Sequence, residues 1–158
     1  MKTSIRVLER TDAYIIAVWR RVMLLIWRNN PQAIGIDRSQ ALFGEWTADQ
    51  PDGAAFLIVV PRQPAGPPDE ATRAAMIRAM ENRGPSLKGV GTLLEAEGFI
   101  AAAARAIMTR LHHKHAHGMA PRVFRSPGEA ASWAAELLQD PQLTVGGLLE
   151  AIRQARES

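Results

Sequence analysis

The sequence predicts an α/β domain with a mixed sheet, and three observations support this class. Residues 13–27 form a β-branched and aromatic run that is too long for one strand. Residues 55–60, AFLIVV, are apolar at every position, as expected for a strand covered on both faces. From there on, helix-like and strand-like segments alternate, which is typical of crossover units and a largely parallel sheet with an antiparallel hairpin at one edge.

The long apolar run is interrupted only by Arg20 and Arg21, so we expect strand, tight turn and strand. An extra strand over residues 5–9 would precede this hairpin. Because a primed hairpin turn favours Asn or Gly, the boundary at the two arginines stays open. Residues 33–48 carry apolar side chains at about helical spacing and predict the first helix.

The second half of the chain continues the alternation. Asp69 is expected to cap a helix that ends near Gly84, with Glu70 in its first turn. We then expect a strand from residue 87, an alanine-rich helix over 97–115, a short strand at 121–126 and a helix opened by Ser126 and Pro127. Thr144 would cap a final amphipathic segment. These boundaries predict an α/β domain over residues 1–141 and a C-terminal helical tail over 142–158.

Composition excludes several classes of protein. The chain has 158 residues, which is enough for one domain with a sizeable core. It contains no cysteine, so disulfides, thiol nucleophiles and thiolate metal sites are excluded. The basic start lacks the apolar core of a signal peptide, and no apolar run reaches the roughly twenty residues of a membrane span. We therefore expect a cytoplasmic protein that does not span a membrane.

Charge does not predict a nucleic-acid partner. The formal net charge is +3, and arginines are scattered along the chain between acidic residues. A nucleic-acid-binding domain would cluster its basic side chains and interleave exposed aromatics. The tryptophans instead fall in apolar runs, which favours core packing.

Two stretches resemble the STAS domain, the fold of bacterial anti-sigma-factor antagonists and their SpoIIAA-like relatives. One is VFRSPGEAASWAAELL, residues 123–138, and the other is LLEAEGFIAAAARAIM, residues 93–108. The likeness covers roughly residues 13–140. It implies a mixed sheet in the order β-β-α-β-α-β-α-β-α with helices packed on it, followed here by the C-terminal amphipathic helix.

Members of that family typically carry a phosphorylatable serine where the strand at 55–60 meets the next helix. A helix N-terminus there would stabilise a phosphoryl group. In this chain the corresponding turn, PRQPAGPPDEAT, contains no serine, and Asp69 and Glu70 occupy the positive helix end. The two acids could mimic a permanently phosphorylated state or simply cap the helix, and we favour capping. Thr72 is the only hydroxyl nearby, so the resemblance departs from the family pattern at its switch.

Other candidate chemistry is weaker. All four histidines lie between residues 112 and 117, and His113 with His117 could hold a divalent metal on one helix face, but no acid or cysteine completes a shell. The simpler interpretation is a favourable interaction with the helix C-terminus. The pair Gly89 and Gly91 lacks the third glycine of a dinucleotide fingerprint and predicts a thin place in a strand where a helix packs closely.

These observations predict a non-catalytic regulatory or scaffold module that binds another protein, without cofactor or metal. The alternative is a carrier of a small apolar ligand or lipid, with a cavity beneath the helix at 97–115. A homodimer through the hairpin edge or the tail is left open. The expected interaction surface comprises Pro67, Pro68, Asp69, Glu70, Thr72, Leu148, Leu149 and Ile152.

Overall fold

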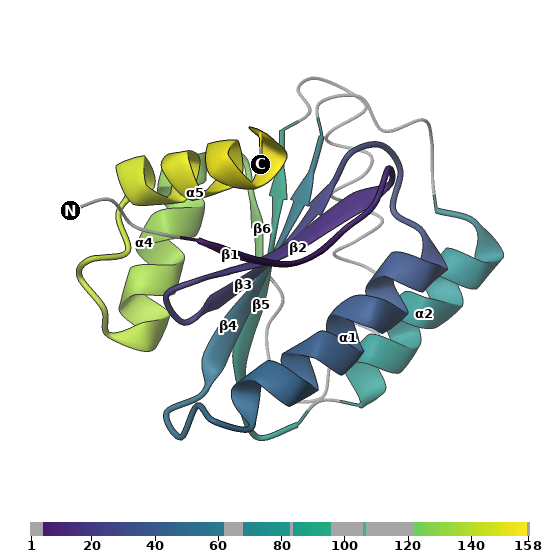
Figure 1. The fold of residues 1–158 in the computed structure, drawn as a ribbon, viewed down its shortest axis with the longest axis horizontal. Helices are drawn as coiled ribbons and strands as arrows, with labels where there is room; N and C mark the ends of the chain where they lie inside the picture. The colour runs from purple at the N-terminus through teal and green to yellow at the C-terminus, as the bar shows by residue number, and fades with distance from the viewer. Residues whose placement is uncertain (1–4, 62–67, 83, 96–105, 107–121, 158) are drawn as a thin grey trace.

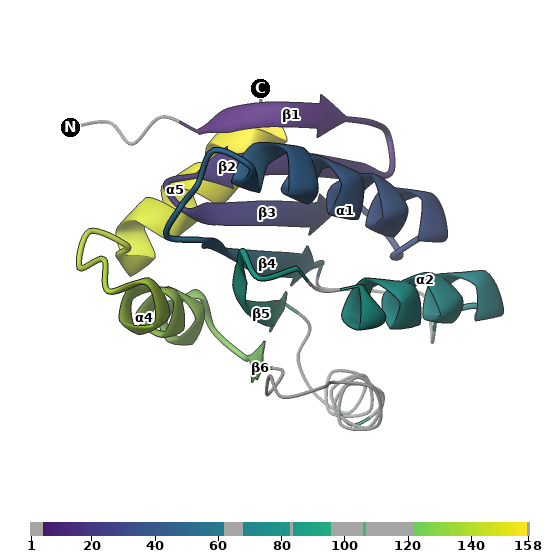
Figure 2. The same cartoon turned by 90° about the horizontal axis from the view of Figure 1, so that it is seen from below.

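The structure, a computed structural model, describes residues 5–61, 68–82, 84–95, 106 and 122–157. Within them, four helices cover a six-stranded mixed sheet (Figures 1 and 2). The elements are β1 Arg6–Arg10, β2 Tyr14–Trp19, β3 Val22–Trp27, α1 Ala33–Thr47, β4 Ala54–Val60, α2 Glu70–Glu81, β5 Leu87–Leu94, β6 Arg122–Phe124, α4 Pro127–Leu138 and α5 Val145–Glu157. The expected α/β class is confirmed. The helix expected over 97–115 lies, but for one residue, outside the described part.

The strands lie in the sheet in the same order as in the chain, from β1 to β6. The pairs β1–β2 and β2–β3 are antiparallel, and the pairs from β3 to β6 are parallel. This is the expected parallel sheet with an antiparallel hairpin at one edge. The parallel connections require crossovers, and α1 and α2 supply the first two on the same face of the sheet.

The hairpin turn consists of Arg20 and Arg21, because Trp19 pairs with Val22 across the two strands. The expected turn at the two arginines is therefore confirmed, and the pairing of the strands gives the boundary that the sequence left open. Arg20 has a φ of 54°, in the left-handed region that Gly or Asn would occupy more easily. Its side chain is held in an ion pair of 2.8 Å with Asp140, between Nε and Oδ2, so tertiary contacts support this turn.

The face covered by α1 and α2 is filled with aromatic rings. Tyr14 and Trp27 meet edge to face at 5.8 Å between centroids, and Phe43 and Phe56 do so at 5.9 Å. Gly35 of α1 allows the first pair to lie under the helix, because a Cβ there would be 2.5 Å from Cη2 of Trp27. Large rings therefore set the spacing between this helix layer and the sheet.

On the opposite face, covered by α4 and α5, small residues let α4 lie close to β5. A Cβ on Gly89 would lie 2.7 Å from Cδ2 of Leu137, and one on Gly91 would lie 3.1 Å from Cζ3 of Trp133. The predicted thin place in β5 is confirmed, since α4 packs directly on these two glycines. The buried residues of α4 are mostly alanines, Ala130, Ala131 and Ala134 among them.

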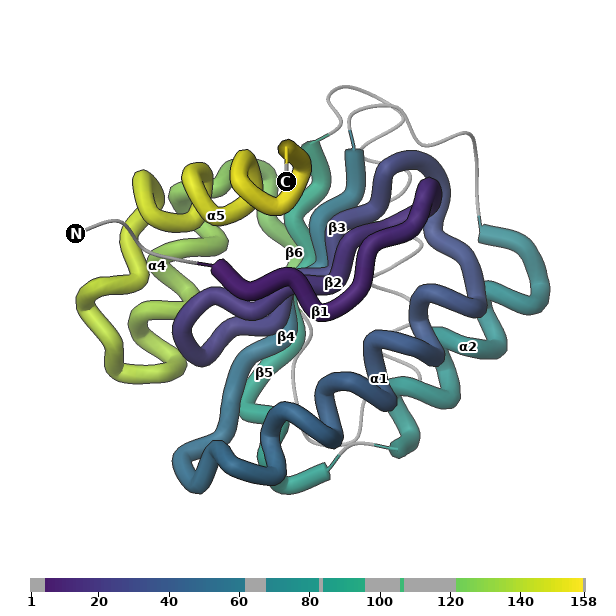
Figure 3. The backbone as a smooth tube through the Cα atoms, viewed as in Figure 1, coloured from purple at the N-terminus to yellow at the C-terminus, as the bar shows by residue number. Residues whose placement is uncertain are grey.

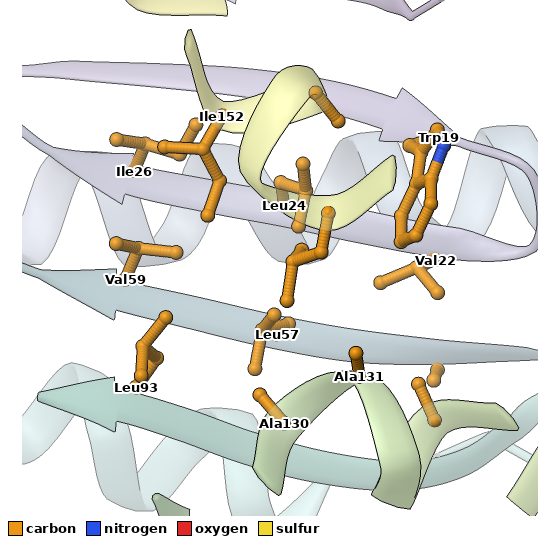
Figure 4. Packing of buried hydrophobic residues seen from close by; sticks show 14 of the residues in the cluster. Trp19, Val22, Leu24, Ile26, Leu57, Val59, Leu93, Ala130, Ala131 and Ile152 are labelled. Atoms are coloured by element: carbon orange, nitrogen blue, oxygen red, sulfur yellow. The ribbon is translucent and has the colours of Figure 1, made fainter. Parts of the chain in front are cut away.

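The C-terminal helix α5 belongs to the same core as the sheet. It lies beside α4 (Figure 3), and its buried side chains pack with those of β2 and β3. Figure 4 shows Ile152 above Ile26 and Leu24. The final segment thus docks on the sheet of its own chain.

Candidate interaction site at the carboxyl end of the sheet

The carboxyl ends of the parallel strands meet at one edge, and α2 begins beside it. β3, β4 and β5 run in the same direction, and the backbone N–H of Glu95 extends their pairing by donating to the carbonyl of Val60 at 3.0 Å. In open α/β sheets this edge is where ligands and modified side chains usually lie. The part of the expected interaction surface that surrounds the start of α2 lies at this edge.

Asp69 is the N-cap of α2, as the sequence predicted. Its Oδ1 accepts a hydrogen bond of 2.8 Å from the backbone N–H of Thr72. The Thr72 hydroxyl, and then its backbone N–H, hold the pKa of Asp69 below the usual range of an aspartate, and the charge of Arg73 adds to this. The positive helix end is thus already matched by an ionised carboxylate of the chain itself.

Thr72 does not lie on the surface, which corrects its place in the expected interaction site. The residue is only 2% exposed and lies among the buried residues of α2, which also include Ala75 and Met80. The hydroxyl interacts with the carboxylate of Asp69. A phosphoryl group on this oxygen would have to displace that interaction and enter the core.

The surface at this corner is formed by the remaining residues. Asp69 and Glu70 are exposed, and Pro68 is half-buried. Pro67 lies outside the described residues. Among the described residues, the predicted surface at this corner therefore consists of Pro68 and the two acids Asp69 and Glu70.

The tail helix also requires a correction. Leu148 is 1% exposed and Ile152 is 5% exposed, so both belong to the core and not to a free surface. They lie on the side of α5 that docks on the sheet, together with Ala151 and Ala155. Leu149 is 49% exposed, as predicted, and Val145, one turn earlier, is 44% exposed.

A polar cluster that the sequence did not indicate joins β1, β2 and α1 at the border of the core, where Tyr14 is buried, Glu9 is half-buried and Arg38 is exposed. The hydroxyl of Tyr14 donates to Oε2 of Glu9 at 2.5 Å, and Nη2 of Arg38 lies 3.0 Å from Oε1 of the same carboxylate. Arg38 and then Tyr14 lower the pKa of Glu9. Burial, followed by the hydrogen bond to Glu9, raises the pKa of Tyr14 to about 12. The cluster ties the hairpin edge to α1.

The amino end of the parallel strands is closed by Arg21. Its guanidinium donates to three backbone carbonyls, those of Gly53 at 2.9 Å, Leu138 at 3.2 Å and Asp52 at 2.5 Å. It thereby joins the hairpin turn, the approach to β4 and the end of α4. Sequence reasoning placed this arginine only in a turn, because nothing local indicates which distant carbonyls it meets.

The other candidate residues have structural places. Ser126 caps α4, since its Oγ accepts from the backbone N–H of Glu129, and Trp19 and Trp27 are core residues at 1% exposure. The four histidines lie outside the described residues. In the described part, no three His, Cys, Asp or Glu side chains gather as a metal site. No helix in that part is both long and apolar enough to cross a membrane.

Comparison with protein families, with curated proteins and with solved structures found no match for this chain.

Proposed function

We propose that this chain is a cytoplasmic, non-catalytic regulatory or scaffold module of STAS-like fold that acts by binding another protein. The observation that carries the proposal is the closed N-terminus of α2. Asp69 caps it, and the only nearby described hydroxyl, that of Thr72, is buried under that cap. The position that carries the phosphorylatable serine in the family it resembles is thus taken up by a permanent acidic cap.

The exposed part of this corner suits protein recognition. Pro68 restricts the backbone just before the helix, so the surface loses little conformational freedom when a partner binds. Glu70 presents an exposed carboxylate next to the Asp69 cap. We expect a partner that offers basic or hydrogen-bond-donating side chains to this corner.

The test compares two glutamates of the same helix. Tagged wild-type chain and the variants Glu70→Gln and Glu81→Gln are used to capture partners from the cell that makes the protein, after chemical crosslinking. Both residues are exposed, and they lie at opposite ends of α2. A protein that is captured by wild type and Glu81→Gln, but several-fold less by Glu70→Gln, supports the proposed corner.

Capture that is equal for all three chains would contradict this corner as the interface.

Native mass spectrometry of the purified chain is the complementary measurement. A bound small apolar molecule or lipid, in the absence of a protein partner, would favour the alternative function of a ligand carrier. The cavity expected for such a ligand would lie beneath residues 97–115, of which the structure describes only residue 106.

A further inference from the structure

The helix α5 rests on the sheet through a narrow apolar contact. Its buried residues are two large and two small ones, Leu148, Ile152, Ala151 and Ala155. Its other large apolar side chains, Val145 and Leu149, point away from the core and are about half exposed. The packing of α5 on β2 and α4 therefore contains two large side chains, Leu148 and Ile152, the second of which is labelled in Figure 4.

The first turn of α5 contains two adjacent glycines with different surroundings. A Cβ on Gly147 would lie 2.9 Å from Cζ2 of Trp19, whereas a Cβ on Gly146 would meet nothing within 4 Å. Glycine at 147 is thus required by the close contact with the tryptophan, and glycine at 146 is not. Both weaken the helix relative to alanine, although Thr144 Oγ1 caps it by accepting from the N–H of Gly147 at 3.1 Å.

The indole N–H of the tryptophan beneath this turn has no hydrogen-bond acceptor in the described structure. Trp19 is 1% exposed, and its Nε1 is buried without a hydrogen-bond partner in the described structure. A buried indole N–H normally finds an acceptor, because burying it without one forfeits its bond to water. The six-membered ring of Trp19 lies against Gly147 in the first turn of α5, so detachment of α5 would uncover this part of the side chain.

The far end of α5 is fastened by polar contacts at the surface. Arg156 pairs with Glu95 at 2.5 Å, and Nη2 of Arg10 donates to the carbonyl of Ala155 at 2.8 Å. Exposed ion pairs of this kind contribute little and weaken with salt. At the near end, Nη1 of Arg21 donates to the carbonyl of Leu138 at 3.2 Å, which joins the end of α4 to the hairpin turn, so the proposed hinge falls within residues 141–144.

From these contacts we propose that α5 is a strap that detaches from β2 as a unit while the sheet and α4 stay folded, uncovering Trp19. A free helix of this length is marginal in water, so the detached segment loses its helical structure. The opening is a property of the single chain and is independent of the proposed function.

Amide hydrogen exchange tests the strap, with the two glycines as a matched pair. In wild type, the amides of α5 from residue 148 onward are expected to exchange together, at least about tenfold faster than those of β3. Gly146→Ala adds helix propensity without a clash and should slow α5 exchange about fivefold. Gly147→Ala adds the same propensity but pushes against Trp19, and should accelerate α5 exchange. Neither variant should change the exchange rate of the β3 amides relative to that of the β4 amides.

Two results would overturn the strap. One is exchange of α5 at the same rate as β3 in wild type, because the helix would then open only with the whole domain. The other is equal slowing of α5 exchange in both variants, because the contact with Trp19 would then have no influence on opening.

Discussion

The two faces of the sheet reach the same degree of burial by different means. On the α1–α2 face, rings such as Tyr14, Trp27 and Phe56 fill a deep layer and meet at edge-to-face angles. On the α4–α5 face, Gly89 and Gly91 allow α4 to lie close to β5. Both faces need a glycine at a close approach, Gly35 on the first and Gly89 with Gly91 on the second. They differ in what the helix meets there, because α1 lies on the rings of the sheet and α4 lies on a strand that lacks side chains at two positions.

The largest expected effect compares neighbouring residues of β4. Phe56 belongs to the α1–α2 core and Leu57 to the α4–α5 core, and they are 4% and 1% exposed. Phe56→Ala should lower the free energy of unfolding by about 3–5 kcal/mol and Leu57→Ala by about 2–5 kcal/mol. Urea unfolding followed by circular dichroism measures both. A loss below about 1 kcal/mol for either variant would mean that its face is not a packed core.

The next effect uses two glycines of α1. Gly35→Ala should lower the free energy of unfolding by about 1–3 kcal/mol, because the new methyl group would collide with the rings of Trp27 and Tyr14. Gly44→Ala is the control, since nothing lies within 4 Å of the added Cβ. It should raise stability by up to about 1 kcal/mol through helix propensity. Thermal unfolding shows whether each variant is more or less stable than wild type. A change in the same direction for both variants would contradict the packing described for this helix.

A third prediction concerns the pKa of the Tyr14 hydroxyl, which lies at the border of the α1–α2 face. Tyr14 is the only tyrosine of the chain, so the absorbance of tyrosinate at high pH reports on it alone. Burial and Glu9 raise its pKa to about 12, against an ordinary value of 10.0. The folded chain should therefore titrate near pH 12, and the chain in urea near pH 10. A raised folded pKa also means that this contribution to stability is present below pH 10 and lost as the pH rises toward 12.

In the same titration, Glu9→Gln should lower the midpoint, because it removes the charge that opposes ionisation of the hydroxyl. A midpoint near pH 10 in the folded wild-type chain would contradict both the burial of the Tyr14 hydroxyl and its hydrogen bond to Glu9.

The smallest effect concerns the cap of α2. The folded pKa of Asp69 lies below its ordinary value of 3.8, so its charge stabilises the fold above that pH and the contribution is lost as the pH falls through the folded pKa. Asp69→Asn keeps a capping oxygen but carries no charge. Wild type should unfold at a higher temperature than this variant at pH 7, and the difference should shrink as the pH falls through the folded pKa of Asp69. A difference that does not depend on pH would argue against an ionised cap.

Local patterns predicted much of this fold. The continuous apolar run at 55–60 indicated β4, and the Asp69 cap, the Ser126-Pro127 helix start and the hairpin at Arg20 could all be found from adjacent residues. Each of these features depends on the preferences of a few neighbouring residues. For the same reason the Gly89–Gly91 pair could be interpreted as a place of close helix packing.

Contacts between distant segments could not be predicted in the same way. The amphipathic pattern of α5 showed that one side would be buried, but not that its own sheet would bury Leu148 and Ile152. The carbonyls that Arg21 meets lie 31 to 117 positions away in the chain. The burial of Thr72 likewise depends on the angle at which α2 meets the sheet, which no local pattern sets.

The central claim is that the corner after β4 acts through its fixed shape and charge and not through phosphorylation. Phosphopeptide mass spectrometry of the intact chain, purified from the cells that produce it and also after incubation with their extract and ATP, tests this most directly. We expect peptides that contain Thr72 to carry no phosphate, because that hydroxyl is buried against the Asp69 cap. A substantial fraction of the folded chain phosphorylated at Thr72 would contradict the account.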